Sequence, residues 1–189
     1  MFLQALRIEN FRAIRKTFIH FDDGTALIGE NDCGISSVLD ALELALGRED
    51  EPLVCQPHLF HHAAGSDQPL GPIRLQLRFR ERSPGEWDHE TYAPFQTLLS
   101  GKKVRTRELW YEIRIQPAQG EDSRFEFRLR SPGSKQKSSD EGLVRLLRQL
   151  NPVVRVSAGM LTGHGQAVTD VGQKKIDLSS FTPEIALRV

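Results

Sequence analysis

The spacing of hydrophobic residues predicts a sheet built mainly from antiparallel strands. In three segments apolar and polar residues alternate strictly, which is typical of strands with one buried and one solvent-facing side. Two shorter strands are predicted near the N-terminus, separated by a polar stretch. The five predicted strands are 73–80 (IRLQLRFR), 109–116 (LWYEIRIQ), 124–130 (RFEFRLR), 2–9 (FLQALRIE) and 17–21 (TFIHF).

A strand–turn–helix unit is predicted over residues 25–47. The apolar run at 25–28 (TALI) predicts a short buried strand that ends at Gly29. Residues 36–46 have the period of a helix, with Val38, Leu42 and Ala45 on one face. Gly47 follows where a C-cap glycine is common.

A second helix and a last strand are predicted in the C-terminal third. Ser138 and Glu141 have the spacing of a capping box. The apolar stripe that follows ends at Asn151-Pro152, and 153–158 (VVRVSA) predicts another buried strand. The stripe consists of Leu143, Leu146, Leu147 and Leu150.

Composition indicates a soluble cytoplasmic protein. The 189 residues are 39% hydrophobic and include two cysteines, too few for a disulfide framework and typical of a reducing compartment. No apolar run is long enough to cross a membrane. The net charge is zero, but residues 1–100 hold 9 Lys and Arg against 15 Asp and Glu, so the second half is basic. That asymmetry favours either a phosphate-rich partner such as DNA or two solvated faces of opposite sign.

The unit at 25–47 also contains a pattern for binding phosphate. A phosphate-binding loop has the form G-x-x-x-x-G-K-[ST] between a strand and a helix, and its backbone N–H groups surround the phosphates. Both glycines and the hydroxyl are in register, but Ile35 stands where the pattern has lysine. We predict a nucleotide-binding loop without its cation; a glycine turn before an ordinary helix is the alternative. The stretch is Gly29-Glu30-Asn31-Asp32-Cys33-Gly34-Ile35-Ser36-Ser37.

The first 47 residues resemble a known family. The element I-x-N-F-R at Ile8 to Arg12, the run I-G-E-N at 28–31 and the helix start S-S-x-L-D-A-L at 36–42 are similar to the N-terminal signature of ABC-type ATPases of the RecF and structural-maintenance-of-chromosomes (SMC) kind. Within that group the chain most resembles the OLD (overcoming lysogenization defect) family of ATP-dependent endonucleases. The resemblance implies an α/β fold, a P-loop NTPase lobe with an antiparallel β-subdomain, and a role in DNA repair or phage defence.

The resemblance also implies ligands and partners. ATP would lie on the loop from Gly29 to Ser37, with Asn31 beside the terminal phosphates and Ser36 as a ligand of Mg²⁺. Arg12 would approach the nucleotide from the neighbouring strand end. Such ATPases dimerise around two ATP molecules. The implied partner is therefore a second copy of the chain or the remainder of an ATPase and nuclease.

Two departures from that family limit the expected activity. Ile35 removes a charge-assisted hydrogen bond worth roughly 1.5–3 kcal/mol, which lowers ATP affinity by about one to two decades. Lysine also stabilises the transition state, so hydrolysis suffers further. The sequence contains no apolar run that ends in paired carboxylates, and no nuclease motif. We therefore expect the N-terminal lobe of a longer ATPase, or a naturally short relative, that does not hydrolyse ATP by itself.

We treat the chain as a single lobe, 1–189, with four parts. Residues 1–48 form the strand–loop–helix core and 49–72 an irregular connection. Residues 73–130 form the β-subdomain, and 131–189 a linker, helix, strand and polar tail.

Other residue groups suggest other chemistry. Cys55, His58, His61 and His62 lie close together, but C-x₂-H-x₂-H-H matches no common zinc pattern. A loop that packs its histidines and Phe60 against the domain is the simpler interpretation.

Two functions other than that of an ATPase lobe stay open, a scaffold and a DNA-binding module. The chain could be a degenerate P-loop scaffold that mediates interactions without nucleotide chemistry. It could also be a DNA-binding module that uses the basic run at 102–107 and the strand arginines. In that case aromatic side chains would stack on bases; the candidates are Trp87, Tyr92, Trp110 and Tyr111.

Overall fold

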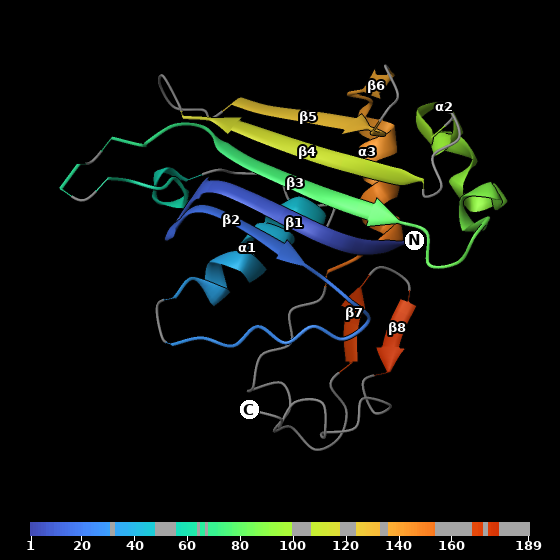
Figure 1. Ribbon diagram of the computed structural model, residues 1–189, viewed down its shortest axis with the longest axis horizontal. Helices are drawn as coiled ribbons and strands as arrows, with labels where there is room; N and C mark the ends of the chain where they lie inside the picture. The colour runs from blue at the N-terminus through green and yellow to red at the C-terminus, as the bar shows by residue number, and fades with distance from the viewer. Residues whose placement is uncertain are drawn as a thin grey trace.

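The computed structural model contains a six-stranded antiparallel sheet in the order β2-β1-β3-β4-β5-β6 (Figure 1). Its strands are β1 (Phe2–Phe11), β2 (Ile14–His20), β3 (Ile73–Arg80), β4 (Glu108–Gln116), β5 (Arg124–Arg130) and β6 (Lys137–Ser138). Two further strands, β7 (Val168–Val171) and β8 (Lys174–Asp177), pair with each other. Apart from β7 and β8, the structure describes residues 1–30, 33–47, 56–63, 65–66, 68–99, 107–117, 124–132 and 136–153.

The five predicted strands are confirmed, and they join into one sheet. β1 pairs with β2 on one side and with β3 on the other, so the N-terminal hairpin and the later strands share a hydrogen-bonded ladder. β1 and β2 are longer than the sequence indicated, because the polar stretch between them forms a tight turn at Arg12 and Ala13. The sheet therefore spans the parts 1–48 and 73–130 and, through β6, reaches into the part 131–189.

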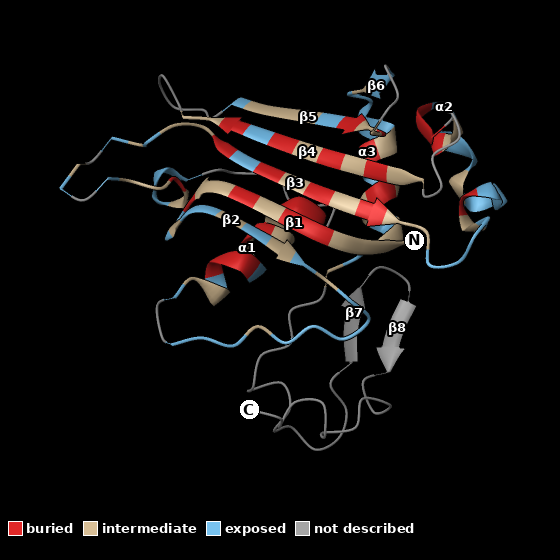
Figure 2. Cartoon of the chain, in the orientation of Figure 1, coloured by how far each residue is buried: buried red, intermediate tan, exposed pale blue. Residues whose placement is uncertain are grey.

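Strict alternation decides which side of the sheet is buried. The apolar residues of β3 and β4 lie on the side covered by α1 (Ile35–Leu46) and α3 (Glu141–Leu150), with α1 against β1 and α3 against β5 (Figures 1 and 2). Both predicted helices are therefore confirmed. The fully buried strand residues include Leu6, Ile8, Ile73, Leu77, Phe79, Leu109, Tyr111, Ile115 and Leu129.

Arg148 of α3 joins the two helices to the sheet. Its Nε donates to the carbonyl oxygen of Ala45 in the last turn of α1 at 3.1 Å, where a cation also opposes the negative end of the helix dipole. Its Nη2 lies 3.4 Å from the hydroxyl of Tyr111 in β4. Burial raises the pKa of Tyr111 to about 12, so this hydroxyl stays neutral.

Short helical turns fill the connection between β3 and β4. They are η2 (Glu86–Asp88), η3 (Glu90–Phe95) and α2 (Gln96–Leu99), and Trp87 and Phe95 in them are fully buried. The prediction that Trp87 and Tyr111 could stack on bases is therefore wrong, because both side chains belong to the core.

Two predictions of local structure are also wrong. Residues 25–28 form no strand, and Ile28 is 78% exposed, because no described strand lies beside this run to bury it. The N-cap of α3 is Asp140, not Ser138: its carboxylate accepts hydrogen bonds from the backbone N–H groups of Gly142 and Leu143. Ser138 instead pairs with Leu129 as part of β6.

Some predictions lie outside the described residues. This holds for most of the strand at 153–158 and for 102–106 of the basic run. Arg107, the described end of that run, is held by Asp88 at 2.7 Å. No helix in the described part of the chain is long and apolar enough to cross a membrane.

Arginines dominate the outer face of the sheet, which we define as the side away from α1 and α3. The register places Arg78 of β3 beside Trp110 of β4, and Trp110 beside Arg130 of β5. The guanidinium carbon of Arg78 lies 4.5 Å from the centre of the Trp110 ring and 5.0 Å from that of Phe18, and Arg130 lies 4.2 Å from Trp110. These cation–π contacts connect the outer strands across the face.

Glu112 is a polar centre of the outer face. Its Oε1 accepts hydrogen bonds from Gln76 at 2.7 Å and from two nitrogens of Arg130 at 2.9 and 2.8 Å. Burial alone would raise the pKa of Glu112, but the hydrogen bonds from Arg130 and Gln76 outweigh it and lower that pKa.

The lowered pKa makes Glu112 a source of acid-sensitive stability. The charged form stabilises the fold above the ordinary pKa of 4.5, and this contribution disappears as the pH falls through the lower folded value. We expect Glu112→Gln to reduce the free energy of unfolding by about 1 kcal/mol at neutral pH, discounted for partial exposure, and by much less in acid. Urea unfolding at several pH values measures this. Glu126→Gln, whose carboxylate lies 3.9 Å from Arg124, is the control; equal pH profiles for the two variants would contradict the prediction.

Candidate functional site

The predicted phosphate loop lines a pocket of about 770 Å³ at the N-terminus of α1. Gly29 and Glu30 lie on one side of the pocket's boundary and the first turn of α1 on another. The turn between β1 and β2 also reaches it, through Arg12 and Ala13. The remaining lining residues are Gly34, Ile35, Ser36, Ser37, His58, Phe60, His61 and His62.

The backbone at the start of α1 suits an anion. Gly34 is the N-cap residue with φ +96°, a left-handed conformation that favours glycine. The N–H groups of the first turn have no partner within a helix, and no described side chain caps them. These groups and the helix dipole therefore favour negative charge in the pocket.

The hydroxyl predicted to hold Mg²⁺ is accessible. Ser36 is exposed in the pocket, whereas Ser37 is 5% exposed. A single exposed hydroxyl is what the phosphate-loop pattern requires at this position, since the remaining Mg²⁺ ligands come from phosphate and water. Asn31 and Asp32 lie outside the described residues.

Apolar groups cover the inside of the loop. A Cβ atom at Gly29 would collide with Sγ of Cys33 and would lie 3.4 Å from Cδ1 of Ile35. Ile35 thus folds back toward Gly29 and brings a hydrocarbon branch where the pattern has an ammonium group. The first turn of α1 leaves its N–H groups uncapped at the pocket, but this side chain adds no charge.

Arg12 fastens three parts of the pocket to one another. Its backbone N–H donates to the carbonyl of Leu59 at 2.8 Å, and its own carbonyl lies 2.7 Å from Nδ1 of His61. Its guanidinium forms an ion pair with Asp40 of α1. These contacts hold Arg12 at φ +50°, a strained conformation for a residue with a side chain. The residue expected to approach the nucleotide does line the pocket, with its charge already paired.

The segment 57–62 lies along the end of β1 and brings histidines to the pocket. Phe60 is 3% exposed and pairs with Phe11 as an isolated bridge, and the N–H of His61 donates to the carbonyl of Asn10 at 3.1 Å. The predicted packing of Phe60 against the domain is confirmed, whereas His58 is exposed and His61 and His62 are only partly buried. No metal-binding group of three or more His, Cys, Asp or Glu is found in the part of the chain that the structure describes, which excludes Cys55.

Sequence reasoning missed the pocket role of His58, His61 and His62. They lie more than twenty residues beyond the loop and follow no pattern for phosphate binding. The pairing of Phe60 with Phe11, together with the hydrogen bonds from Arg12 to Leu59 and from His61 to Asn10, brings them to it. Asp40 was also missed as the partner of Arg12, although it belongs to the S-S-x-L-D-A-L element.

Comparison with protein families and curated proteins identifies relatives. The family model described as "Protein of unknown function (DUF2813)" matches residues 1–183. The chain is 28% identical over 163 residues to the chromosome partition protein Smc of Halobacteriovorax marinus, covering 82% of this chain and 13% of that protein. It is 32% identical over 120 residues to the uncharacterized protein YbjD of Escherichia coli, covering 63% of this chain and 22% of YbjD. The chain therefore spans less than a quarter of either relative.

A solved structure shares the fold. It comes from work described as "Structural biochemistry of ATP-driven dimerization and DNA stimulated activation of SMC ATPases", with a TM-score of 0.52 and 18% identity. The match covers 80% of this chain and 82% of that one. The mixed α/β architecture with an antiparallel sheet is thus similar to that of an SMC ATPase.

The strain at Arg12 gives a test of the pocket geometry. Arg12→Ala and Arg12→Gly both remove the ion pair with Asp40, but only glycine relieves φ +50°. We expect both variants to be less stable than the parent, with the glycine variant about 1 kcal/mol more stable than the alanine variant. Chemical denaturation measures both differences. As a control, Ala13→Gly changes a neighbouring position without positive φ and should only destabilise the protein. If Arg12→Ala is as stable as Arg12→Gly, the conclusion that the backbone of Arg12 is strained is wrong.

Proposed function

The chain belongs to the DUF2813 family, and we propose that it is the nucleotide-binding lobe of an ABC-type ATPase whose loop at 29–37 binds the phosphates of ATP. The observation that carries this proposal is the pocket of about 770 Å³ into which the uncapped first turn of α1 opens. A shared fold with an SMC ATPase and the relationship to an Smc protein support it.

Backbone groups provide most of the binding in this proposal. The N–H groups of the first turn bind phosphate oxygens, Gly29 and Gly34 allow the close approach, and the Ser36 hydroxyl holds Mg²⁺. Mg²⁺, when bound, neutralises charge on the phosphates. Ile35 contributes no charge, so binding is weaker than in a loop with lysine, and hydrolysis by the chain alone is negligible.

The partner in this proposal completes the nucleotide site. The chain spans 13% and 22% of its two relatives, whose remaining lengths contain other parts. In OLD-like ATPases, which the first 47 residues resemble, ATP is held between two lobes and controls a nuclease. We propose the same organisation here, in DNA repair or defence, with either a second copy or the rest of a longer ATPase as the second lobe.

Equilibrium binding of Mg-ATP tests the nucleotide proposal. We expect weak binding to the parent and about ten- to hundredfold tighter binding to Ile35→Lys, because the new ammonium group adds a charge-assisted hydrogen bond. Isothermal titration calorimetry at low and moderate salt measures both affinities.

A matched control separates a site-specific gain from general attraction. Leu39→Lys adds the same charge to the same helix at a 40% exposed position that does not line the pocket. Its affinity should stay within about twofold of the parent, since the added charge is solvent-screened. If the parent and Ile35→Lys are both folded and neither binds Mg-ATP, the proposal is overturned in favour of a scaffold function.

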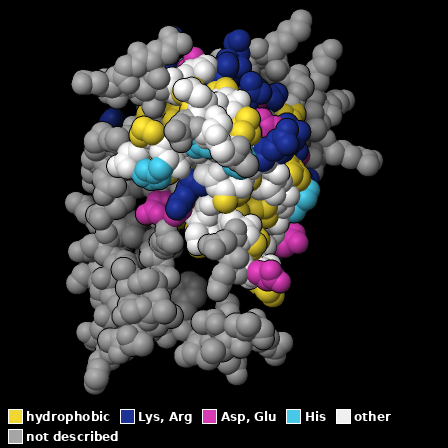
Figure 3. Space-filling view, turned by 90° about the vertical axis from the view of Figure 1, so that its left-hand side faces the viewer, with side chains coloured by type: hydrophobic (Ala, Val, Ile, Leu, Met, Phe, Trp, Pro, Cys, Tyr) yellow, Lys and Arg dark blue, Asp and Glu magenta, His cyan; other side chains and the backbone are white. Residues whose placement is uncertain are grey.

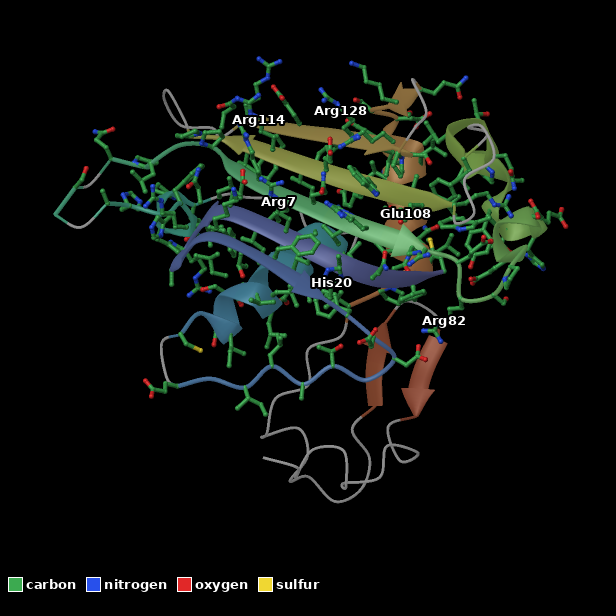
Figure 4. The ribbon with its side chains drawn as sticks, in the orientation of Figure 1. Arg7, His20, Arg82, Glu108, Arg114 and Arg128 are labelled. Carbon is green, nitrogen blue, oxygen red and sulfur yellow. The ribbon has the colours of Figure 1, made fainter. Side chains whose placement is uncertain are left out.

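The outer face of the sheet supports a second candidate, contact with DNA. Cations outnumber carboxylates on this face, and Arg114 and Arg128 project from β4 and β5 (Figure 4). Phe18, 43% exposed, and Trp110 are aromatic side chains of the face, but Arg78 already stacks on both and Arg130 on Trp110. Phosphate contact is therefore favoured over base stacking. The cations are Arg7, Lys16, Arg74, Arg78, Arg80, Arg114, Arg124, Arg128, Arg130 and Lys137, and the carboxylates are Glu9, Glu108, Glu112 and Glu126.

Salt-dependent binding of a duplex oligonucleotide tests this candidate. Replacing both Arg114 and Arg128 by alanine should weaken binding and reduce the slope of log K against log salt by about 1 to 2, since each phosphate contact contributes about 0.9. Fluorescence anisotropy at several salt concentrations measures the slope. The pair Arg15→Ala and Arg82→Ala removes the same charge from exposed positions elsewhere. An equal loss of DNA affinity and of salt slope in this control would show that only net charge matters, and would contradict specific contact through Arg114 and Arg128.

A further inference from the structure

Three histidines line the same pocket as the phosphate loop. We name His58, His61 and His62 the histidine wall. Figure 3, which faces this end of the molecule, shows histidine side chains at the surface among basic and acidic ones. The wall is fixed in place, because Leu59 bonds to Arg12, His61 bonds to Asn10, and Leu70 donates to the carbonyl of His61 at 2.9 Å.

The hydrogen bond of His61 determines which ring nitrogen is left for a ligand. Nδ1 lies 2.7 Å from the carbonyl oxygen of Arg12. A carbonyl oxygen only accepts, so Nδ1 carries the proton and Nε2 is left over. A neutral ring presents a lone pair at Nε2, which repels a phosphate oxygen, whereas a protonated ring presents an N–H there. An anion in the pocket therefore selects the protonated ring.

Other positive charge in the pocket is scarce. Arg12, from the turn between β1 and β2, is paired with Asp40 of α1, and Glu30 from the loop is negative. The described residues of 63–70, which pack against the wall, carry no charged side chain, and neither does Asn10. A phosphate chain would meet Ile35 where lysine is absent. The imidazole rings are thus the groups able to add charge.

We propose that the histidine wall replaces the missing lysine through His61, which binds the terminal phosphates of the nucleotide as an imidazolium ion and donates to them from Nε2. The inference rests on the proposed nucleotide-binding function. Because each nucleotide then binds together with a proton, affinity for Mg-ATP rises as the pH falls from about 8 to about 6.

Calorimetry with Mg-ATP tests the wall directly. Titrations at three pH values, each in two buffers of different ionisation enthalpy, give the affinity and the number of protons taken up. For the parent we expect the affinity for Mg-ATP to fall by up to about tenfold for each unit by which the pH rises, which is the limit for one proton. Binding should be accompanied by net proton uptake. Circular dichroism at each pH confirms that the protein is folded.

Two substitutions identify the responsible ring. His61→Asn keeps an N–H donor for the Arg12 carbonyl but cannot be protonated, so its affinity should be independent of pH and weaker than that of the parent in acid. His20→Asn is the matched control: His20 lies on β2 against Phe18, away from the pocket, and its loss should leave the pH profile unchanged. The double variant Ile35→Lys with His61→Asn should bind tightly without proton uptake.

The outcomes separate this inference from the function on which it rests. If the parent binds Mg-ATP without pH dependence or proton uptake, the proposed role of the histidine wall is overturned and the nucleotide-binding function stays in place. A His61→Asn variant with an unchanged pH profile also overturns it. If neither the parent nor Ile35→Lys binds at any pH, the nucleotide function and the wall are overturned together.

Discussion

The ion pair between Arg12 and Asp40 is the contact on which the candidate site depends. It links the turn between β1 and β2 to the second turn of α1, and so sets where the first turn of the helix lies relative to the sheet. Arg148 fixes the other end of the same helix through the carbonyl of Ala45. With both ends held, the N-terminus of α1 faces the pocket as a preformed group of hydrogen-bond donors. Strain at Arg12 is the energetic cost of this geometry.

The two faces of the sheet have different tasks. The inner face is apolar and buries α1 and α3, which gives the lobe its core. The outer face satisfies its charges laterally, through Glu112 with Arg130 and through arginines stacked on Trp110. Ala5 lies between His20 and Arg78 in the register, and its small side chain allows Arg78 to reach Phe18 across β1. Because these groups bind one another, the face is stable without a partner.

The pocket combines a retained backbone with an altered side chain. In the proposed function the glycines and the helix N-terminus provide the geometry for phosphate, since a backbone site needs only the right conformation. Side-chain charge is a separate requirement, and Ile35 does not meet it. If the proposed function holds, such a site separates nucleotide binding from hydrolysis, because binding draws on N–H groups and neighbouring histidines while the transition state lacks its cation. Such a lobe suits a role in which bound nucleotide organises partners.

Sequence alone determined the elements whose periodicity is strong. Alternation over β3, β4 and β5 and the helical period of α1 fix which residues turn inward, because burial of one face dominates the energy of each element. The phosphate-loop pattern is also local, so the sequence could suggest it, and its nucleotide role stays a prediction. Tertiary structure decided the rest. The run at 25–28 is apolar yet exposed, because burial needs a neighbouring strand, and Trp87 and Tyr111 are core residues. The histidine wall reaches the pocket through the pairing of Phe60 with Phe11 and the hydrogen bonds beside it, which are contacts between distant segments that no local pattern encodes.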